Sequence, residues 1–364
     1  MNILFLNWRD IRNPYSGGAE ILTHELMKGL VKRGHSVTLF TSFFHGSEKE
    51  ETIDGVRVIR EGKQDARTLF SSVHYKAYLF YKNHKGFDLV VDEIHGVPFF
   101  TPLYVRGERV ALVCEVAGNL WDFAVKFPFN FFGKIIERIY PIFYRNTLSL
   151  TISESSKKEM RKIGFRKIYV LPMGSNTPIN SKVLNKSEPN LIFLARVSKA
   201  KGVEDALKAL KIVKGQIFNI RLLIVGPINK NYKKYLLKLI NQTNLSKNVR
   251  IYGEVSEEEK IEFLDEAYLL VSPSQKEGWG LTIHEAGARG VPSVVYDVPG
   301  LKDVVKDGIN GIICERNRPE ELSKNILKLL NDKKLYMRLQ KGAIEERKKQ
   351  TWDKTIEMFL KEVQ

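Results

Sequence analysis

Short apolar runs alternate with longer amphipathic stretches along almost the whole chain. The runs are rich in Val, Ile and Leu, which is typical of parallel strands buried on both faces of a sheet. Stretches such as 19–33 and 203–214 carry apolar residues at helical spacing. Such repeated β-α units predict a doubly wound α/β fold with right-handed crossovers. The predicted strands are 3–6, 36–41, 56–59, 89–91, 110–113, 148–152, 168–171, 191–194, 221–225, 249–252, 268–271, 292–295 and 312–314.

The pattern pauses once, at a polar stretch with three prolines that follows Leu171. We therefore expect an N-terminal Rossmann-like domain at 1–172, a linker at 173–189 and a C-terminal Rossmann-like domain at 190–349. Residues 350–364 carry apolar side chains at helical spacing and predict a final amphipathic helix. Ligands of such domains bind beyond the carboxyl ends of the strands, and two domains facing each other would enclose an interdomain cleft.

Composition narrows the class of protein. The 364 residues suit two domains better than one core, and 43% hydrophobic with 27% charged residues is an ordinary globular balance. Two cysteines, Cys114 and Cys314, exclude a disulfide scaffold and a cysteine-built metal site, and they suit a reducing compartment. No leader pattern follows Met1 and no apolar run is long enough to span a bilayer, so we expect a cytoplasmic location.

The first candidate loop is YSGGAE at 15–20, which opens a long helix. Gly17 and Gly18 would let another molecule approach the backbone, and free amides at a helix start attract anions. A flexible loop with Ser16 as the helix N-cap is the alternative. No G-x-G-x-x-G follows the strand, so this loop is no dinucleotide fingerprint.

The second candidate loop, ARVSKAKG at 195–202, places Arg196 and Lys201 directly after a predicted strand. Two cations that converge at a strand end would suit a diphosphate, because Arg can donate two hydrogen bonds to it. A solvated basic turn would have the same sequence.

The third candidate loop, KEGWGLTIHEA at 276–286, is the most informative. Glu277 lies in the loop, Gly278 and Gly280 free the backbone, and the amides near Gly280 and Leu281 should point at an anion. Glu285 falls about one turn into the following helix, where a carboxylate could accept hydrogen bonds from a diol such as ribose. In the alternative interpretation, Glu277 is a favourable charge near the helix dipole and Glu285 is a buried partner of a basic residue.

Together these loops make the chain resemble the family 4 retaining glycosyltransferases of GT-B fold. The E-x7-E pair Glu277 and Glu285 resembles the family's signature, and Arg196 with Lys201 resembles its R-x4-K pair. Further similarities appear in the same order over nearly the whole chain: GGAE at 17–20, ISES at 152–155, VLPMG at 170–174, IYGEV at 251–255 and DGINGIIC at 307–314. The resemblance implies two Rossmann-like domains facing a cleft, with a C-terminal helix that packs back toward the first domain.

The resemblance also implies a role for each matching residue. Arg196 and Lys201 would hold the donor's diphosphate, Glu277 would contact the transferred sugar, and Glu285 would bind the ribose. It implies nucleotide-sugar binding by Gly17, Gly18, Gly226, Val255, Gly278, Trp279, Gly280, Leu281 and Glu285. Two departures, Asn176 for a usual Asp and Trp279 for a usual Phe, remove no charge that the reaction needs.

Metal and cofactor chemistry are not expected. The chain has no D-x-D triplet and no Cys/His cluster at metal spacing, so we expect metal-independent transfer without a cofactor. Retention of configuration is implied by the family resemblance alone. The sequence itself offers no obvious enzymatic nucleophile that would indicate it.

A fourth loop, VDEIHGVP at 91–98, lies where the family has residues that face the acceptor. Either Glu93 or His95 could orient an acceptor hydroxyl, and Glu93 is the one that aligns with the family's usual histidine. A strand-end carboxylate beside a packed histidine is the alternative.

The formal net charge of +16 is unevenly distributed. Residues 196–250 carry +11, whereas 251–288, with Glu277 and Glu285, carry −7. Residues 121–145 interleave Lys and Arg with many aromatic side chains, which suits peripheral contact with an anionic membrane surface. A core helix with its loop is the alternative for this segment.

The sequence thus predicts an enzyme that moves a hexose or N-acetylhexosamine from a nucleotide-diphosphate sugar, of UDP or GDP type, to a glycan or lipid-linked acceptor. A rival with the same fold is an epimerase similar to UDP-N-acetylglucosamine 2-epimerase. A basic nucleic-acid-binding protein would explain the charge but not the Glu277 and Glu285 pair, so we expect no nucleic-acid partner. The sequence leaves open the donor base, the sugar, the acceptor and the oligomeric state.

Overall fold

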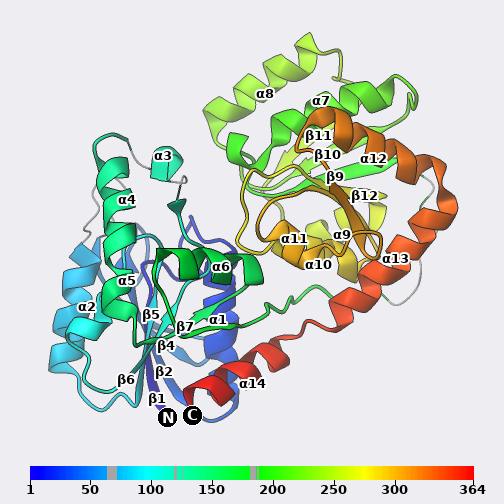
Figure 1. Cartoon of the computed structure of the whole chain (residues 1–364). Coiled ribbons are helices and arrows are strands. Elements are labelled where there is room, and N and C mark those ends of the chain that lie inside the picture. The colour runs from blue at the N-terminus through cyan, green and yellow to red at the C-terminus, as the bar shows by residue number, and fades with distance from the viewer. Residues whose placement is uncertain (64–71, 119–120, 125, 181–185, 187) are drawn as a thin grey trace. The chain divides into compact units, whose positions relative to one another are not determined.

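The computed structural model describes residues 1–63, 72–118, 121–124, 126–180, 186 and 188–364. They divide into two compact units (Figure 1). Unit 1 comprises 1–174 with 351–364, and unit 2 comprises 175–350. Each is an α/β unit built around one largely parallel sheet.

In the described part of unit 1, eight strands form a sheet in the order β3-β4-β2-β1-β5-β6-β7-β8. All neighbours are parallel except β3 and β4, which pair antiparallel at the edge. The strands are β1 (Asn2–Leu6), β2 (Ser36–Phe43), β3 (Glu50–Ile53), β4 (Val56–Lys63), β5 (Leu89–Glu93), β6 (Glu108–Leu112), β7 (Leu148–Thr151) and β8 (Ile168–Val170). Strand β1, for example, is NILFL and is buried from Ile3 onward, as the apolar run predicts.

Helices cover both faces of this sheet, and the last one comes from the end of the chain. They are α1 (Gly18–Lys32), α2 (Ser72–Asn83), η1 (Thr101–Leu103), α3 (Trp121–Ala124), α4 (Phe129–Ile139), α5 (Pro141–Tyr144), α6 (Glu154–Ile163) and α14 (Trp352–Val363). Helix α14 packs against α1 (Figure 1), where Ile356 lies over Gly29 and Phe359 stacks on Phe5 of β1. The C-terminal helix is thus part of the first unit's core.

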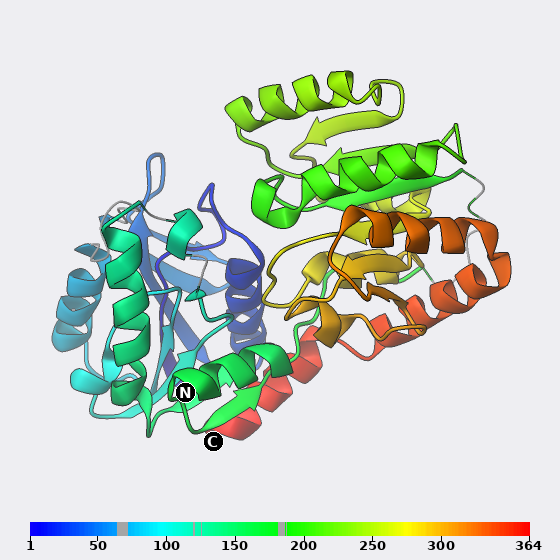
Figure 2. The same ribbon diagram turned by 45° about the horizontal axis from the view of Figure 1, so that its top comes forward.

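In the described part of unit 2, six parallel strands lie in the order β11-β10-β9-β12-β13-β14. They are β9 (Asn190–Leu194), β10 (Arg221–Val225), β11 (Val249–Gly253), β12 (Leu269–Ser272), β13 (Ser293–Tyr296) and β14 (Gly311–Cys314). The helices are η3 (Lys199–Lys201), α7 (Val203–Lys214), α8 (Lys230–Gln242), α9 (Glu257–Glu266), α10 (Leu281–Ala288), α11 (Leu301–Val304), α12 (Pro319–Asn331) and α13 (Lys333–Lys348). Helices α7 and α12 lie side by side (Figure 2), and α10 packs with α13.

Each of the predicted strands is present, and the doubly wound α/β prediction is confirmed. The exception is β3, which the apolar pattern does not indicate because its side chains alternate between exposed and half-buried. Within the predicted linker, residues 181–185 and 187 lie outside the described residues. None of the described helices is long and apolar enough to cross a membrane.

Candidate functional site

In unit 2, the third and fourth strands of the sheet, β9 and β12, are neighbours although two strands separate them along the chain. The chain leaves β9 toward one side of the sheet and later continues from β12 toward the other, so this pair is the topological switch point. Ligands of doubly wound sheets bind beyond the carboxyl ends of the strands at such a point. The loops that follow β9 and β12 are the two that carry Lys201 and Glu277.

Close contacts join these two loops. The amide of Gln275 donates to the carbonyl of Ala200 at 2.9 Å. Gly202 has φ of +78° and packs so tightly that an added Cβ would lie 1.9 Å from the carbonyl oxygen of Pro273. Glycine is therefore required there for the loops to meet.

The two predicted catalytic side chains of these loops form an ion pair. Lys201 Nζ lies 2.7 Å from Glu277 Oε1, which also accepts a hydrogen bond from Ser274 Oγ at 2.9 Å. Arg196 is exposed on the loop after β9, on the same side of the switch point as Lys201. The structure thus brings Lys201 and Glu277 together and fixes Glu277 from a second side.

Helix α10 begins directly after this loop. Gly280 is its N-cap with φ of +96°, a conformation that favours glycine, and Leu281 is its first residue. Behind Gly278, Gly300 packs against the backbone of Glu277 and Gly278. The loop at the start of α10 is therefore held by close backbone packing, with its amides at the carboxyl end of the sheet.

Trp279 points into the unit. Its ring is buried and stacks on His284 with ring centroids 5.4 Å apart. Burial and the nearby charge of Arg347 lower the pKa of His284 to about 3, so this imidazole is neutral. Trp279 supports the loop through its ring.

Glu285 lies one turn into α10 and is also buried. Its Oε1 atom is 2.7 Å from Nζ of Lys260, which belongs to α9. Glu285 is therefore the buried partner of a basic residue, as the alternative interpretation expects. This contact engages Oε1 only, and the second carboxylate oxygen, Oε2, takes no part in it.

The loops after β10 and β11 meet beside the same switch point. The amide of Gly226 donates to the carbonyl of Gly253 at 2.7 Å, and Gly226 lies against the carbonyl of Ala195 with φ of +131°. Val255 follows Gly253 and is half-buried. The loop with Gly226 thus contacts the one that carries Arg196, and the loop that leads to Val255 contacts Gly226.

Unit 1 has its own switch point, between β1 and β5. Glu93 is the last residue of β5 and is fully buried, and three side chains converge on its carboxylate. Asn7 Nδ2 donates to Oε2 at 2.6 Å, the Thr23 hydroxyl donates to the same oxygen, and His95 Nε2 lies 2.7 Å from Oε1. Glu93 is therefore saturated from within the protein.

His95 is the outer member of this pair, with a side chain 17% exposed and stacked on Trp8. Burial alone would lower its pKa, but the hydrogen bond and the charge of Glu93 raise the pKa of His95 overall. Burial raises the pKa of Glu93, and the hydrogen bond from His95 opposes this. The geometry therefore exposes an imidazole whose charge is set by a buried carboxylate.

The glycine loop begins α1 beside this cluster. The N-cap is Gly17, so the interpretation of Ser16 as N-cap is wrong. Glu20 Oε2 accepts the amide of Gly17 at 2.7 Å and supplies the capping interaction from inside the helix. Gly18 has open space where a Cβ would be.

A family model described as "Glycosyltransferase Family 4" matches residues 16–177, and one described as "Glycosyl transferases group 1" matches 176–346. The chain belongs to the family 4 glycosyltransferases. This confirms the resemblance inferred from the motifs.

Relatives of this glycosyltransferase family align over different lengths. An uncharacterized glycosyltransferase of Methanocaldococcus jannaschii is 31% identical over 49% of this chain and 49% of its own length. The poly(glycerol-phosphate) alpha-glucosyltransferase of Bacillus subtilis is 30% identical over 48% of this chain and 26% of its own. The chain therefore spans about half or less of the length of these two curated relatives. A second uncharacterized glycosyltransferase of M. jannaschii is 25% identical over 91% of this chain and 90% of its own length.

Solved structures show the fold of this chain. Sucrose-phosphate synthase from Thermosynechococcus elongatus superposes with a TM-score of 0.82 at 18% identity, covering 99% of this chain and 97% of the other. Anabaena HepE in complex with UDP and glucose superposes with a TM-score of 0.78 at 18% identity, covering 100% and 99%. The GT-B fold prediction is confirmed.

The aromatic and basic segment 121–145 divides into buried and exposed parts, and its residue Val125 lies outside the described residues. Trp121, Tyr140 and Tyr144 are buried, as the core-helix interpretation predicts. Other large apolar side chains are exposed, which that interpretation does not explain: Phe127, Phe129, Phe131, Phe132, Ile135, Ile139, Ile142 and Phe143.

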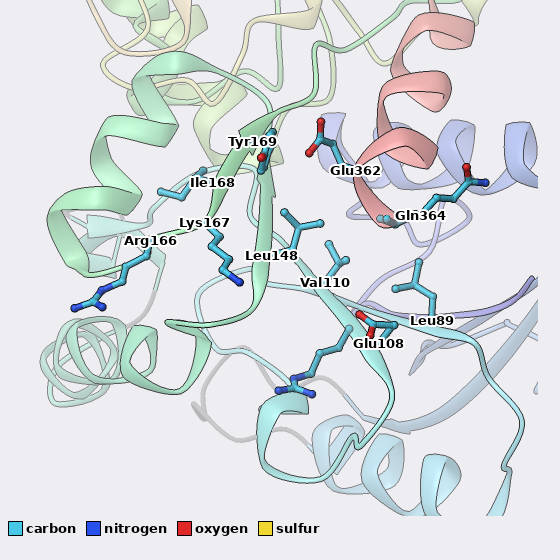
Figure 3. Close-up of a pocket in the computed structure, with 12 residues that line it drawn as sticks. Leu89, Glu108, Val110, Leu148, Arg166, Lys167, Ile168, Tyr169, Glu362 and Gln364 are labelled. Carbon is cyan, nitrogen blue, oxygen red and sulfur yellow. The ribbon is translucent and has the colours of Figure 1, made fainter.

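A pocket of about 810 Å³ lies elsewhere in unit 1 (Figure 3). It is formed at the amino ends of β5 to β8, where Leu89, Glu108, Leu148 and Ile168 are first residues of their strands, and by the end of α14. None of the predicted site residues lines it. It lies at the opposite edge of the sheet from Glu93 and is separate from the candidate site.

Several functional candidates are not indicated by the motifs. Lys260, Asn7, Thr23 and Ser274 contact predicted site residues but belong to no motif. For Lys260 a signal exists in the sequence, because it is the one basic residue between Ile251 and Gln275, a stretch rich in Glu. Asn7 and Thr23 carry no such signal.

Proposed function

We propose that this protein transfers a hexose or N-acetylhexosamine from a nucleotide-diphosphate sugar to a glycan or lipid-linked acceptor, with retention of configuration and without a metal. The observation that carries the proposal is the Lys201–Glu277 ion pair at the switch point of unit 2, at the start of α10. Family membership supports the same reaction class.

The residues at this point suit a donor diphosphate. Lys201 and Arg196 supply positive charge, and the amides at the start of α10 supply oriented hydrogen-bond donors. Preorganised charges of this kind stabilise the negative charge that develops on a departing diphosphate, which is the role a metal has in other enzymes. A UDP or GDP type donor is proposed, and the HepE structure with UDP and glucose supports the former.

In the proposed reaction the bond between the anomeric carbon and the diphosphate oxygen breaks, and the acceptor hydroxyl oxygen bonds to that carbon on the same face. The hydroxyl proton passes to the departing phosphate oxygen, and the free nucleotide diphosphate carries away the electron pair. Glu277, held by Lys201 and Ser274, would contact hydroxyls of the transferred sugar. Glu285 would bind the ribose.

For the acceptor side we propose a division of labour between Glu93 and His95. His95 is the partly exposed group and would contact the acceptor hydroxyl, whereas Glu93 is saturated and would set the orientation and charge of His95. His95 is then the catalytic residue of the pair and Glu93 a positioning residue.

We further propose that the enzyme works as a peripheral protein at the cytoplasmic face of a membrane. Trp121 packs against Gly96, next to His95, and against Gly133 of α4, so α4 is fastened to the loop that carries His95. On and around α4, the exposed surface of 126–143 offers the apolar side chains given above, with the exposed Lys126 and Arg138 among them. Such a face suits anionic lipid, where each basic residue contributes about 1 kcal/mol of attraction.

A screen for donor binding tests the reaction class. Thermal unfolding is measured with UDP-, GDP-, ADP- and dTDP-sugars, because a ligand that binds the folded state raises its Tm. The best donor is then incubated with glycan and lipid-linked acceptors, and wild type is compared with Lys201→Ala. We expect transfer by wild type only. Epimerised nucleotide sugar without transfer, or normal transfer by Lys201→Ala, would reject the proposal.

Vesicle flotation tests the membrane proposal. Wild type should float with anionic vesicles at moderate salt and not with neutral ones, and Phe131→Ser with Phe132→Ser should abolish flotation. The matched control is Phe218→Ser, because Phe218 is 80% exposed but lies in unit 2. Equal flotation of all three proteins would show that the exposed face of α4 does not bind lipid.

A further inference from the structure

Lys260 links two acidic residues in unit 2 that lie at different depths. Its Nζ atom is 2.7 Å from Oε1 of Glu285 and 2.7 Å from Oε2 of Glu257. The side chains of Lys260 and Glu285 are 13% and 9% exposed, whereas that of Glu257 is 75% exposed. Glu257 therefore holds the ammonium group from the solvent side while the group faces the buried carboxylate of Glu285.

The electrostatic balance at Glu285 depends on this lysine. Burial, with a smaller effect of the Glu257 charge, raises the pKa of Glu285. The charge and hydrogen bond of Lys260 oppose that rise, as does the charge of Arg347 on α13. Burial alone would lower the pKa of Lys260, but Glu285 and Glu257 outweigh it, and the pKa of Lys260 is raised. The ammonium group therefore stays charged, and it is the cation in contact with the Glu285 carboxylate.

The contact with Lys260 also makes the two carboxylate oxygens of Glu285 unequal. Oε1 of Glu285 is occupied by Lys260, and among the described residues no hydrogen bond is recorded for Oε2. A carboxylate with one oxygen fixed by a lysine and the other open is oriented to accept hydrogen bonds from hydroxyl groups. A protonated carboxyl presents an O–H donor in place of one of its acceptor sites.

We propose that Lys260 is a positioning residue for donor binding: it keeps Glu285 ionised and turned so that Oε2 accepts hydrogen bonds from the donor's ribose. This inference rests on the proposed role of Glu285 in ribose binding. Lys260 itself does not touch the nucleotide. Its effect reaches the ligand through Glu285.

The test is nucleotide affinity as a function of pH. Binding of UDP and of GDP to the full chain is measured by calorimetry between pH 5.5 and 8.5 for wild type, Lys260→Met and Lys260→Arg. Without the lysine only the charge of Arg347 opposes the effect of burial, so Glu285 should protonate at a higher pH than in wild type. We expect Lys260→Met to bind at least tenfold more weakly than wild type at pH 6, to recover toward pH 8.5, and Lys260→Arg to restore the wild-type profile.

Two further variants separate positioning from simple structural support. In a Glu285→Gln background the pH-dependent loss caused by Lys260→Met should disappear, since no ionisable carboxyl remains. The control is Lys324→Met, which removes an exposed lysine paired with Glu321 at i,i+3 on α12 and should leave the binding profile unchanged. If Lys260→Met does not fold, Lys260→Gln, which removes the charge and keeps a polar side chain, should give a shift in the same direction.

The outcomes are distinct. If wild type binds no nucleotide, the proposed function fails, whatever Lys260 does. If wild type binds and Lys260→Met matches it at every pH, or is weaker by the same factor at every pH, Lys260 supports the fold only and the inference is overturned.

Discussion

Each unit buries a carboxylate near the switch point of its sheet, and the two carboxylates differ in how their oxygens are engaged. Glu93 lies at the β1/β5 switch point of unit 1, and Glu285 follows the β9/β12 switch point of unit 2 on α10. Glu93 has contacts from Asn7, Thr23 and His95 that occupy both of its oxygens. Glu285 has one cation on one oxygen.

The difference indicates which carboxylate can serve a ligand. A carboxylate that is fully buried and has partners on both oxygens is out of a substrate's reach, so its influence passes through the group it holds, here His95. A buried carboxylate with a lysine on one oxygen keeps its other oxygen available to accept hydrogen bonds. Burial and sequence position do not distinguish the two, whereas the partners do.

The largest expected effect is on turnover when Glu285 is removed. Glu285→Ala should lower kcat/KM for the donor by about 10² to 10³, the loss typical of deleting one charged group that holds a reacting substrate. Donor titrations in a transfer assay measure it. Lys260 keeps Glu257 as a partner in this variant, so the free energy of unfolding should fall little. A variant with normal kcat/KM would place the ribose elsewhere.

The next effect is on stability when Glu93 is removed. Glu93→Ala leaves the buried donors of Asn7 and Thr23, and the ring of His95, without their acceptor, which should lower the free energy of unfolding by about 3 kcal/mol. Urea denaturation followed by circular dichroism measures the loss. The comparison predicts a larger loss for Glu93→Ala than for Glu285→Ala, and the reverse order would contradict it.

A third, smaller effect concerns pH. The fold raises the pKa of His95 through Glu93, so the stabilisation from this pair is complete at low pH and is lost as the pH rises through that raised pKa. Glu93→Gln keeps the shape and removes the charge, so the pKa of His95 should fall. The corresponding inflection of the pH profile of kcat should then move to lower pH, with kcat reduced several-fold and donor affinity unchanged. An unmoved inflection would separate His95 from the reaction.

Much of the fold follows from local sequence. Buried parallel strands are continuous apolar runs, and both sheets show them, for example in Ile3–Leu6 and Leu191–Leu194. Strand β3 does not, because an antiparallel edge strand needs only one neighbour and tolerates the polar residues of Glu50–Ile53. The cap of α1 is similar: Ser16 has the usual cap side chain, but Glu20 caps the amide of Gly17 from within the helix.

The sequence predicts a site residue well when its residue type and its place directly after a strand decide its role. It predicts less when contacts between separate helices and strands decide the role. Lys201 and Glu277 each follow a strand, and the switch point brings them together. The pairing of Lys260 with Glu285 joins two helices through the fold, so spacing does not reveal it. Nor does sequence show that Glu93 is saturated while His95 is exposed, because that depends on Asn7 and Thr23.

The smallest effect tests the two glycine loops against each other. Gly18 has open space where a Cβ would be and is the first residue of α1, so Gly18→Ala should stabilise the fold by about 0.5 kcal/mol. Gly202 has a positive φ and lies against Pro273, so Gly202→Ala should destabilise the fold.

If a diphosphate or sugar approaches the backbone at Gly18, as predicted, Gly18→Ala will unfold at a slightly higher Tm yet transfer more slowly, because the new methyl group occupies the ligand's place. Thermal unfolding and transfer rates measured on one preparation decide this, since a loss of activity without a loss of stability is the signature of ligand contact. Unchanged transfer by Gly18→Ala would leave the glycine with a role in the loop alone.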